Sequence, residues 1–237
     1  MHCIIDRGNT KTKIYFFKED TLKSSFSALN EEEEALASFL SKNKYTKGIF
    51  SSSSDVPLFM DTTKFLILNK ETPLPFTLNY NTPETLGTDR IALAAGAHFL
   101  YPQSNCLVIS TGTCITIDLI DKKSVYQGGI ISLGLTIRLE AMHTFTENLP
   151  LLRIKKQASF PLIGKSTEES MESGVYNGTI SEIDQTISQF KAIYKDLTAI
   201  ITGGDHKMFE LHLKNEIFAQ PNLQAIGLNR ILLHNAR

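Results

Sequence analysis

The feature that most constrains the fold is a pattern that occurs twice in the chain. In residues 3–18 an apolar run ends at Asp6, a polar turn containing Gly8 follows, and a second apolar run begins at Lys13. In residues 106–120 the run CLVI leads into the turn STGT, and the run CITIDLI follows. Aligning Gly8 with Gly112 superposes both runs and both turns. The sequence therefore predicts a duplicated β-hairpin, the alternative being two unrelated hairpins.

Segments with strand character alternate with segments of helical spacing along the rest of the chain. Strands are predicted over residues 48–51, 65–68 and 197–201, with a short apolar segment at 223–226. Helices are predicted over residues 31–41, 88–101, 132–147 in part, 167–190 with an interruption near Gly174 and Gly178, and 229–234. Residues 207–214 are amphipathic, and the serine run 51–54 is interpreted as a loop. This alternation predicts an α/β protein.

Composition excludes several classes of protein. The 237 residues carry a formal net charge of -1, from 24 basic and 25 acidic residues, so no basic field is available to bind nucleic acid. No stretch has the roughly 20 apolar residues of a membrane helix, and MHCIIDRG lacks the pattern of a signal peptide. A cytoplasmic protein with a small-molecule partner is expected. Cys3, Cys106 and Cys114 are expected to be buried core residues, not metal ligands.

Three turns rich in small residues follow predicted strands, at residues 6–12, 110–113 and 202–205. Glycine lets a backbone approach an anion, and successive N–H groups form an anion-binding concavity. Three such turns suggest a nucleoside triphosphate, although the chain has neither GxxxxGK[ST] nor GxGxxG. Asp6 could order Mg2+ through water, and Lys13 could neutralise phosphate; the alternative for Asp6 is an Asx-turn.

The segment GTDR opens the predicted helix 88–101. Asp89 could cap the helix, or it could accept a proton from a substrate hydroxyl. Arg90 could bind a substrate carboxylate with two hydrogen bonds, and Tyr80 could line the same pocket. Gly128 and Gly129 either allow close approach of a ligand or form an ordinary turn.

Together these segments resemble the type III pantothenate kinases of the acetate and sugar kinase, Hsp70 and actin superfamily. The matching segments, in the order of the family, are IDRGNTKTK, GTDR, VISTGTCITID, GGIISLGL, IGKSTEESMESGVYNG and ITGGD. The resemblance implies duplicated domains of the ribonuclease H-like (actin-like ATPase) fold with a cleft between them. Residues 1–104 would form the first domain, joined by a C-terminal helix at 227–237, and residues 105–226 the second.

The resemblance also implies a reaction, which is the ATP-dependent phosphorylation of pantothenate, the first step of coenzyme A biosynthesis. Asp89 would be the general base, Asp6 would hold Mg2+ through water, and Ser110 stands where the family binds potassium or ammonium. The implied ATP-binding residues are Asp6, Arg7, Gly8, Asn9, Thr10, Lys11, Thr12, Lys13 and Thr113. The implied pantothenate-binding residues are Tyr80, Gly87, Thr88, Asp89, Arg90 and Thr167. Family members are homodimers with the substrate site at the subunit interface.

The chain departs from the family pattern at two positions. Ser110 replaces an aspartate, and a neutral hydroxyl is a weaker ligand for a hard cation, so the need for a monovalent cation is left open. Leu133 replaces a proline, which is expected to alter a turn without removing a catalytic group. Two alternatives remain, a non-catalytic relative similar to the Bvg accessory factor group and a kinase of the same fold for another substrate, such as a sugar.

Overall fold

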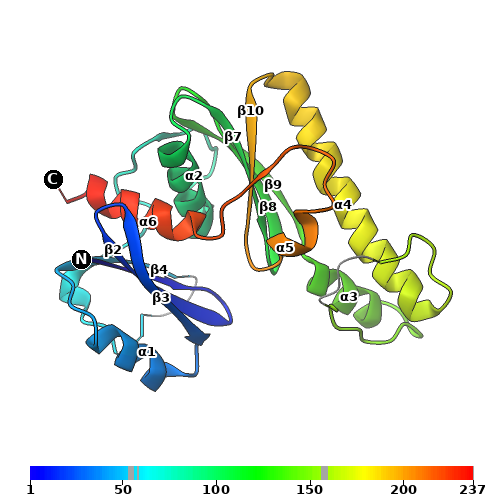
Figure 1. The fold of residues 1–237 in the computed structure, drawn as a ribbon, viewed down its shortest axis with the longest axis horizontal. Coiled ribbons are helices and arrows are strands. Elements are labelled where there is room, and N and C mark those ends of the chain that lie inside the picture. Colours follow the sequence, from blue (N-terminus) through cyan, green and yellow to red (C-terminus); the bar gives the residue numbers. More distant parts are fainter. Residues whose placement is uncertain (53–55, 58, 156–159, 237) are drawn as a thin grey trace. The chain divides into compact units, whose positions relative to one another are not determined.

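The computed structural model describes residues 1–52, 56–57, 59–155 and 160–236 (Figure 1). The chain forms two compact units, which are described one at a time below. Unit 1 comprises Met1–Pro102, Lys123–Tyr126 and Asn222–Arg237, and unit 2 comprises Gln103–Lys122 and Gln127–Pro221. The predicted domain limits, 1–104 and 105–226, stay a prediction.

Unit 1 is built on a five-stranded sheet in the order β3-β2-β1-β4-β5. Its strands are β1 (His2–Arg7), β2 (Lys11–Lys18), β3 (Thr21–Leu29), β4 (Lys47–Ser52) and β5 (Phe65–Ile67). Strand β1 pairs antiparallel with β2 and parallel with β4. Alternate residues of β1 and β2, such as Ile5 and Phe16, pack against Leu36 and Leu40 of helix α1 (Glu33–Ser41).

Two further helices complete unit 1, α2 (Thr88–Leu100) and α6 (Leu223–His234). Two glycines at their contact allow the helices to pack closely. A Cβ at Gly227 would collide with the carbonyl oxygen of Ala92, and one at Gly96 would collide with the carbonyl oxygen of Leu223. The remaining elements of this unit are short: η1 (Thr62–Lys64), β6 (Thr77–Leu78) and η2 (Pro83–Thr85). Strand β6 pairs with the first residues of β9, Val125 and Tyr126.

Unit 2 repeats the strand order of unit 1. Its strands are β7 (Asn105–Thr111), β8 (Cys114–Ile120), β9 (Val125–Leu133), β10 (Leu197–Thr202) and β11 (Phe218–Ala219). They follow the order β11-β10-β7-β8-β9, with β7 antiparallel to β8 and parallel to β10. Each strand therefore has a counterpart in unit 1. The corresponding pairs are β1 and β7, β2 and β8, β3 and β9, β4 and β10, and β5 and β11. The predicted duplication of the hairpin is confirmed, and it extends to five strands.

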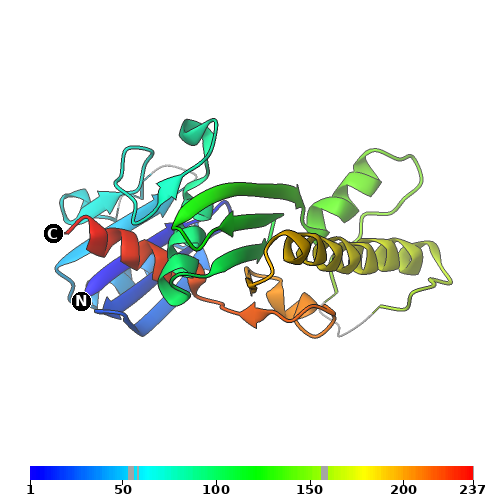
Figure 2. The ribbon, with the colours of Figure 1, turned by 90° about the horizontal axis from the view of Figure 1, so that it is seen from above.

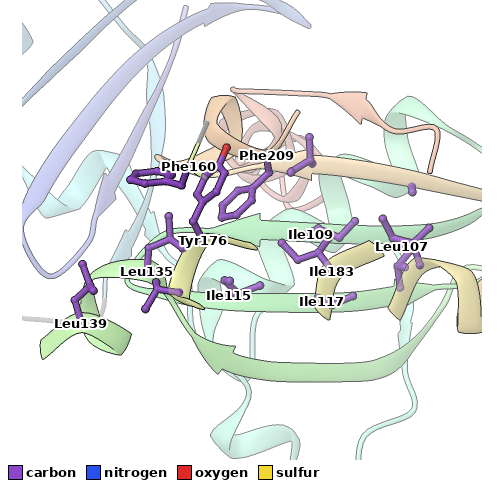
Figure 3. Packing of buried hydrophobic residues seen from close by; sticks show 14 of the residues in the cluster. Leu107, Ile109, Ile115, Ile117, Leu135, Leu139, Phe160, Tyr176, Ile183 and Phe209 are labelled. Atoms are coloured by element: carbon purple, nitrogen blue, oxygen red, sulfur yellow. The ribbon is translucent and has the colours of Figure 1, made fainter. Parts of the chain in front are cut away.

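One long helix, α4 (Thr167–Ile193), packs against the second sheet with part of its length and extends beyond the ends of its strands (Figure 2). Its buried residues Val175, Ile183 and Ile187 pack with Ile109 and Ile117 of the hairpin. Figure 3 shows this cluster, to which α3 (Leu135–Thr144) contributes Leu135 and α5 (His206–Phe209) contributes Phe209. The α/β fold predicted from the sequence is thus confirmed. None of the helices described is long and apolar enough to cross a membrane.

Several predicted boundaries were wrong. Helix α4 continues through Gly174 and Gly178, since the apolar stripe that it buries outweighs the cost of about 1 kcal/mol per helical glycine. The helix predicted for part of residues 132–147 is α3 (Leu135–Thr144), as expected. The pair Gly128 and Gly129 lies within β9, so it is not a turn. A Cβ at Gly129 would collide with the carbonyl oxygen of Ile117, so this glycine permits close strand packing.

The structure also differs from the predictions near the C-terminus, at one cysteine and in two strands. Residues 223–226 already belong to α6, and the amphipathic segment 207–214 is helical only to Phe209. Cys3 and Cys106 are buried as expected, but Cys114 is exposed, because it starts β8 directly after the turn. Strand β3 was not predicted. Of the serine run, Ser51 and Ser52 end β4, and residues 53–54 lie outside the described residues.

Candidate active site

The first glycine turn joins β1 to β2. Gly8 N–H donates to the carbonyl oxygen of Lys11 at 3.0 Å, which closes the hairpin. Asp6, just before the turn, lies opposite Lys13 on β2 and beside Ser51 on β4. Antiparallel pairing directs opposite side chains to the same face, so the hairpin itself brings an acid and a lysine together.

Asn30, which the sequence did not reveal, also contacts this turn. Its amide donates to the carbonyl oxygens of Gly8 (2.9 Å) and Asn9 (3.2 Å), and its side-chain oxygen accepts from the Thr12 hydroxyl at 2.8 Å. Its own N–H donates to the Thr10 carbonyl oxygen at 3.0 Å. Thr12 is fully buried, and the bond of its hydroxyl to Asn30 satisfies that buried group.

Asp6 is a partly buried carboxylate whose ionisation is disfavoured. Burial, the largest cause, raises its pKa to about 6, and the negative charge of Asp89 also raises it. The positive charge of Lys13 and a hydrogen bond from Gln224 lower the pKa of Asp6 but do not offset burial. Gln224, on α6, donates from Nε2 to Asp6 Oδ1 at 2.8 Å. No sequence signal pointed to Gln224.

Asp89 lies in the first turn of α2, where Gly87 occupies the N-cap position. Its side chain is exposed, and its carboxylate lies over Gly87, where any Cβ would collide with Oδ1. Ser51 donates from its hydroxyl to that of Thr88 at 3.1 Å, which ties the end of β4 to the start of α2. The predicted acid of the G-T-D-R segment is therefore accessible and lies close enough to Asp6 to influence its ionisation.

Arg90 and Tyr80 form the inner part of the same region of unit 1. Arg90 is buried, with 5% of its surface exposed, and its guanidinium lies 5.9 Å from the centroid of the Tyr80 ring. The Tyr80 ring packs in turn against buried Tyr126, with ring centroids 6.0 Å apart. The guanidinium of an arginine carries a planar fork of donors, which suits recognition of a carboxylate.

The second glycine turn, in unit 2, is supported by two neighbouring segments. Thr111 donates from its hydroxyl to the Thr202 carbonyl oxygen at 3.0 Å, and the Asp205 N–H donates to the Thr111 carbonyl oxygen at 3.1 Å. Gly203 adopts φ +97°, and a Cβ there would collide with Thr111. The predicted T-G-G turn thus packs directly on the predicted second phosphate turn. Thr113 at its tip is exposed.

Gly134 supports this turn from the other side. Its N–H donates to the carbonyl oxygen of Thr113 at 3.0 Å, and a Cβ at Gly134 would collide with the carbonyl oxygen of Gly112. Leu133, which replaces the family's proline, ends β9 just before it. With leucine at position 133, the turn after β9 lies in close contact with the glycine turn.

Ser110 lies opposite Thr116 on β8, as Asp6 lies opposite Lys13. The second hairpin therefore carries two neutral hydroxyls where the first carries an acid and a lysine. Among the described residues, the buried Thr116 Oγ1 has no hydrogen-bond partner. Thr167, the remaining predicted substrate contact, is the exposed first residue of α4, and Ser166 caps the helix by accepting from the Glu169 N–H at 3.2 Å.

Comparisons with known proteins agree with this architecture. The family model described as type III pantothenate kinase matches residues 3–189. The type III pantothenate kinase of Cytophaga hutchinsonii is 39% identical over 237 residues, which cover 99% of this chain and 100% of the relative. That of Christiangramia forsetii is 40% identical over 248 residues, which cover 99% of each.

Solved structures of low sequence identity share the fold of this chain. A protein of Campylobacter jejuni named as a Baf family transcriptional activator has a TM-score of 0.65 at 21% identity, covering 98% of each chain. A Sinorhizobium meliloti protein named as a 2-dehydro-3-deoxygalactonokinase has a TM-score of 0.58 at 11% identity, covering 100% of this chain and 98% of that one. The match to the family model and the identity to full-length relatives show that this chain belongs to the type III pantothenate kinase family and is a phosphotransferase.

Proposed function

We propose that the protein transfers the γ-phosphoryl group of ATP to the primary hydroxyl of pantothenate, giving 4'-phosphopantothenate and ADP. The curated relatives that match over the full length carry the name of this activity. The observation in the structure that supports it best is the open space beside the two turn glycines, Gly8 and Gly112.

Neither glycine is needed by the protein's own conformation or packing. Neither has φ in the left-handed region, where glycine is favoured. A Cβ at Gly8 would meet only the Lys11 carbonyl oxygen, at 3.6 Å, and one at Gly112 only that of Cys114, at 4.0 Å. The space beside both glycines is therefore open, as an anion approaching the backbone requires.

The proposed contacts with ATP follow from these turns. In unit 1 they are those of Asp6, Arg7, Gly8, Asn9, Thr10, Lys11, Thr12 and Lys13, with Lys13 supplying positive charge to the phosphates. In unit 2 the contact is that of Thr113, which is exposed at the tip of its turn. Phosphoryl transfer depends mainly on positioning and charge stabilisation, which backbone N–H groups and a lysine provide.

Mg2+ suits the environment of Asp6. Its carboxylate is disfavoured as an anion by burial and by the charge of Asp89, so a cation beside it would relieve both effects. No group of three or more His, Cys, Asp or Glu side chains that could hold a metal occurs among the described residues. A Mg2+ ion at Asp6 would be held through one carboxylate, water and phosphate oxygens. When bound, Mg2+ would neutralise charge on the phosphates.

The acceptor side of the reaction uses residues of the G-T-D-R segment. We propose that Asp89 takes the proton of the pantothenate hydroxyl as its oxygen bonds to the γ-phosphorus and the bond to the ADP oxygen breaks. Arg90 binds the pantothenate carboxylate, and Tyr80, Gly87, Thr88 and Thr167 line the substrate site. The accessibility of Asp89 and the position of the Arg90 guanidinium near the Tyr80 ring support these roles.

The position for a monovalent cation differs from the family pattern. Ser110 and Thr116 offer two neutral oxygens in place of a carboxylate, which is a weak donor set for potassium or ammonium. The roles proposed for Asp89 and Arg90 involve no such ion.

A phosphoryl-transfer assay with ATP, Mg2+ and pantothenate, with and without potassium or ammonium, tests the proposal. Formation of 4'-phosphopantothenate supports it. Binding of ATP without transfer to pantothenate would overturn it in favour of a non-catalytic relative, and transfer to sugars but not to pantothenate would indicate another kinase.

Gly8→Ala is expected to leave the fold intact but weaken ATP binding. The added methyl meets no protein atom closer than 3.6 Å, so the free energy of unfolding should change by less than about 1 kcal/mol. The same methyl occupies the space that the phosphates need, so KM for ATP should rise about tenfold or more. Steady-state kinetics and thermal unfolding measure both. An unchanged KM for ATP would contradict the role given to this turn.

We also propose a homodimer with the substrate site at the subunit interface. Its support in unit 2 is a set of large apolar side chains left exposed before α4, including Phe145 (85% exposed), Leu162 and Ile163. Light scattering should give twice the chain mass of 26.5 kDa, which is about 53 kDa. Phe145→Ser should shift the mass toward the monomer, whereas Leu211→Ser, at an equally exposed position, should not. A monomeric wild type would contradict the proposal.

A further inference from the structure

The first glycine turn lies at the end of the β1–β2 hairpin. A hydrogen bond from Gly8 to Lys11 closes its backbone, and Asn9, Thr10 and Lys11 are exposed. A binding loop of this kind gains affinity when its bound conformation is fixed beforehand, because ordering then costs less on binding. A residue outside the turn that fixes its conformation would therefore favour binding.

Asn30 provides that support from the residue directly after β3. It makes four hydrogen bonds, three from its side chain and one from its backbone. Their partners are Gly8 O, Asn9 O, Thr10 O and Thr12 Oγ1, at 2.9, 3.2, 3.0 and 2.8 Å. One residue thus bonds to four of the five positions from 8 to 12.

These bonds set the direction of the N–H groups in the turn. In a planar trans peptide, the carbonyl of one residue and the N–H of the next point in opposite directions. The carbonyls of Gly8, Asn9 and Thr10 all point to Asn30, so the N–H groups of Asn9, Thr10 and Lys11 point away from it. Three successive N–H groups directed to one side form the type of concavity that binds phosphate.

We infer that Asn30 is a positioning residue, which holds the first glycine turn with its N–H groups aimed at the phosphates of ATP. This inference rests on the proposed function. Thr12 acts through Asn30: its side chain is fully buried, and its hydroxyl donates to Asn30 Oδ1. Thr12 then contributes to ATP binding through its backbone and through the hydrogen bond that orients Asn30. Its hydroxyl does not bond directly to a phosphate.

Asn30→Ala tests this, because it removes three side-chain hydrogen bonds and keeps the backbone bond to Thr10. KM for ATP should rise about tenfold, while KM for pantothenate stays within about twofold. Amide hydrogen exchange of residues 8–12 in the ligand-free protein should become faster. Asn43→Ala is the matched control, since it removes one comparable bond from a side-chain amide to a carbonyl, that of Phe39, elsewhere in unit 1.

A double-mutant cycle with Thr12→Val tests whether the two residues act as one unit. If Thr12 works through Asn30, the double variant should raise KM for ATP no more than Asn30→Ala alone. Independent, additive effects would mean that the Thr12 hydroxyl binds ATP itself and would overturn that part of the inference. Should Asn30→Ala fail to fold, Asn30→Asp keeps the size and the acceptor for Thr12 but loses the donor, and the same faster exchange is expected.

The outcomes separate the two proposals. If the wild type transfers no phosphoryl group to pantothenate, the proposed function fails, while exchange in the ligand-free protein still reports on Asn30. If Asn30→Ala matches Asn43→Ala in both exchange and KM for ATP, the inference fails even though the enzyme is a kinase.

Discussion

Asp89→Asn is expected to lower kcat for pantothenate about a thousandfold, which is within the range for loss of a general base. The amide keeps the size of the side chain but cannot accept the proton of the acceptor hydroxyl. Because Asp89 is exposed, the fold should be unaffected, and KM for ATP should change little. A transfer assay together with thermal unfolding separates these effects.

Glu84→Gln is the control for this experiment, because it removes an exposed acid from η2 in the same unit without touching the predicted site. It should retain full activity. A kcat for Asp89→Asn within about threefold of the wild type would mean that the proton leaves by another route.

Asp6→Asn is expected to abolish most phosphoryl transfer and yet stabilise the ligand-free protein. The folded state raises the pKa of Asp6 from 3.8 to about 6, so the folded state binds the proton more tightly than the unfolded state does. The carboxyl group therefore stabilises the fold at low pH, and this contribution is lost as pH rises through the interval between those two values. At pH 8 a neutral asparagine should be more stable by about 1–3 kcal/mol.

The pH dependence provides the check on this prediction. The difference in the free energy of unfolding between Asp6→Asn and wild type should grow from about pH 4 to about pH 6 and then stay constant. Asp61→Asn is the control of opposite sign, because hydrogen bonds from Thr63 lower the pKa of the exposed Asp61. Neutralising Asp61 should not stabilise the protein at pH 8. A destabilised Asp6→Asn variant would show that Asp6 is a structural acid, as its Asx-turn interpretation requires.

The elements that the sequence predicted are those with local signals. Each hairpin, around Gly8 and around Gly112, combines an apolar run, a turn residue and a second run within a few positions. The duplication could therefore be predicted from the sequence. Strand β3 was missed because its residues alternate between exposed and half-buried without a continuous apolar face. Glycines 174 and 178 were misread because the burial of α4 against the sheet is a tertiary effect.

In the candidate site, too, the residues that lie in local motifs were predicted and those that lie outside such motifs were not. Asp6, Lys13 and the G-T-D-R segment lie in motifs, and the structure places Asp6 beside Lys13 within one hairpin. Asn30 and Gln224 carry no local signature, because their importance comes only from what the fold brings next to them. Gln224 lies 218 residues after Asp6, and no spacing rule could have connected the two.

That long separation has a consequence during protein synthesis. Helix α6 packs on α2 and supplies the amide that holds Asp6, yet the ribosome must first translate the whole of unit 2 between them. At typical elongation rates this takes on the order of ten seconds, during which β1 and α2 are available but lack their last partner. Until α6 is translated, the surface of α2 that Gly96 opens for α6 therefore has no helix packed on it.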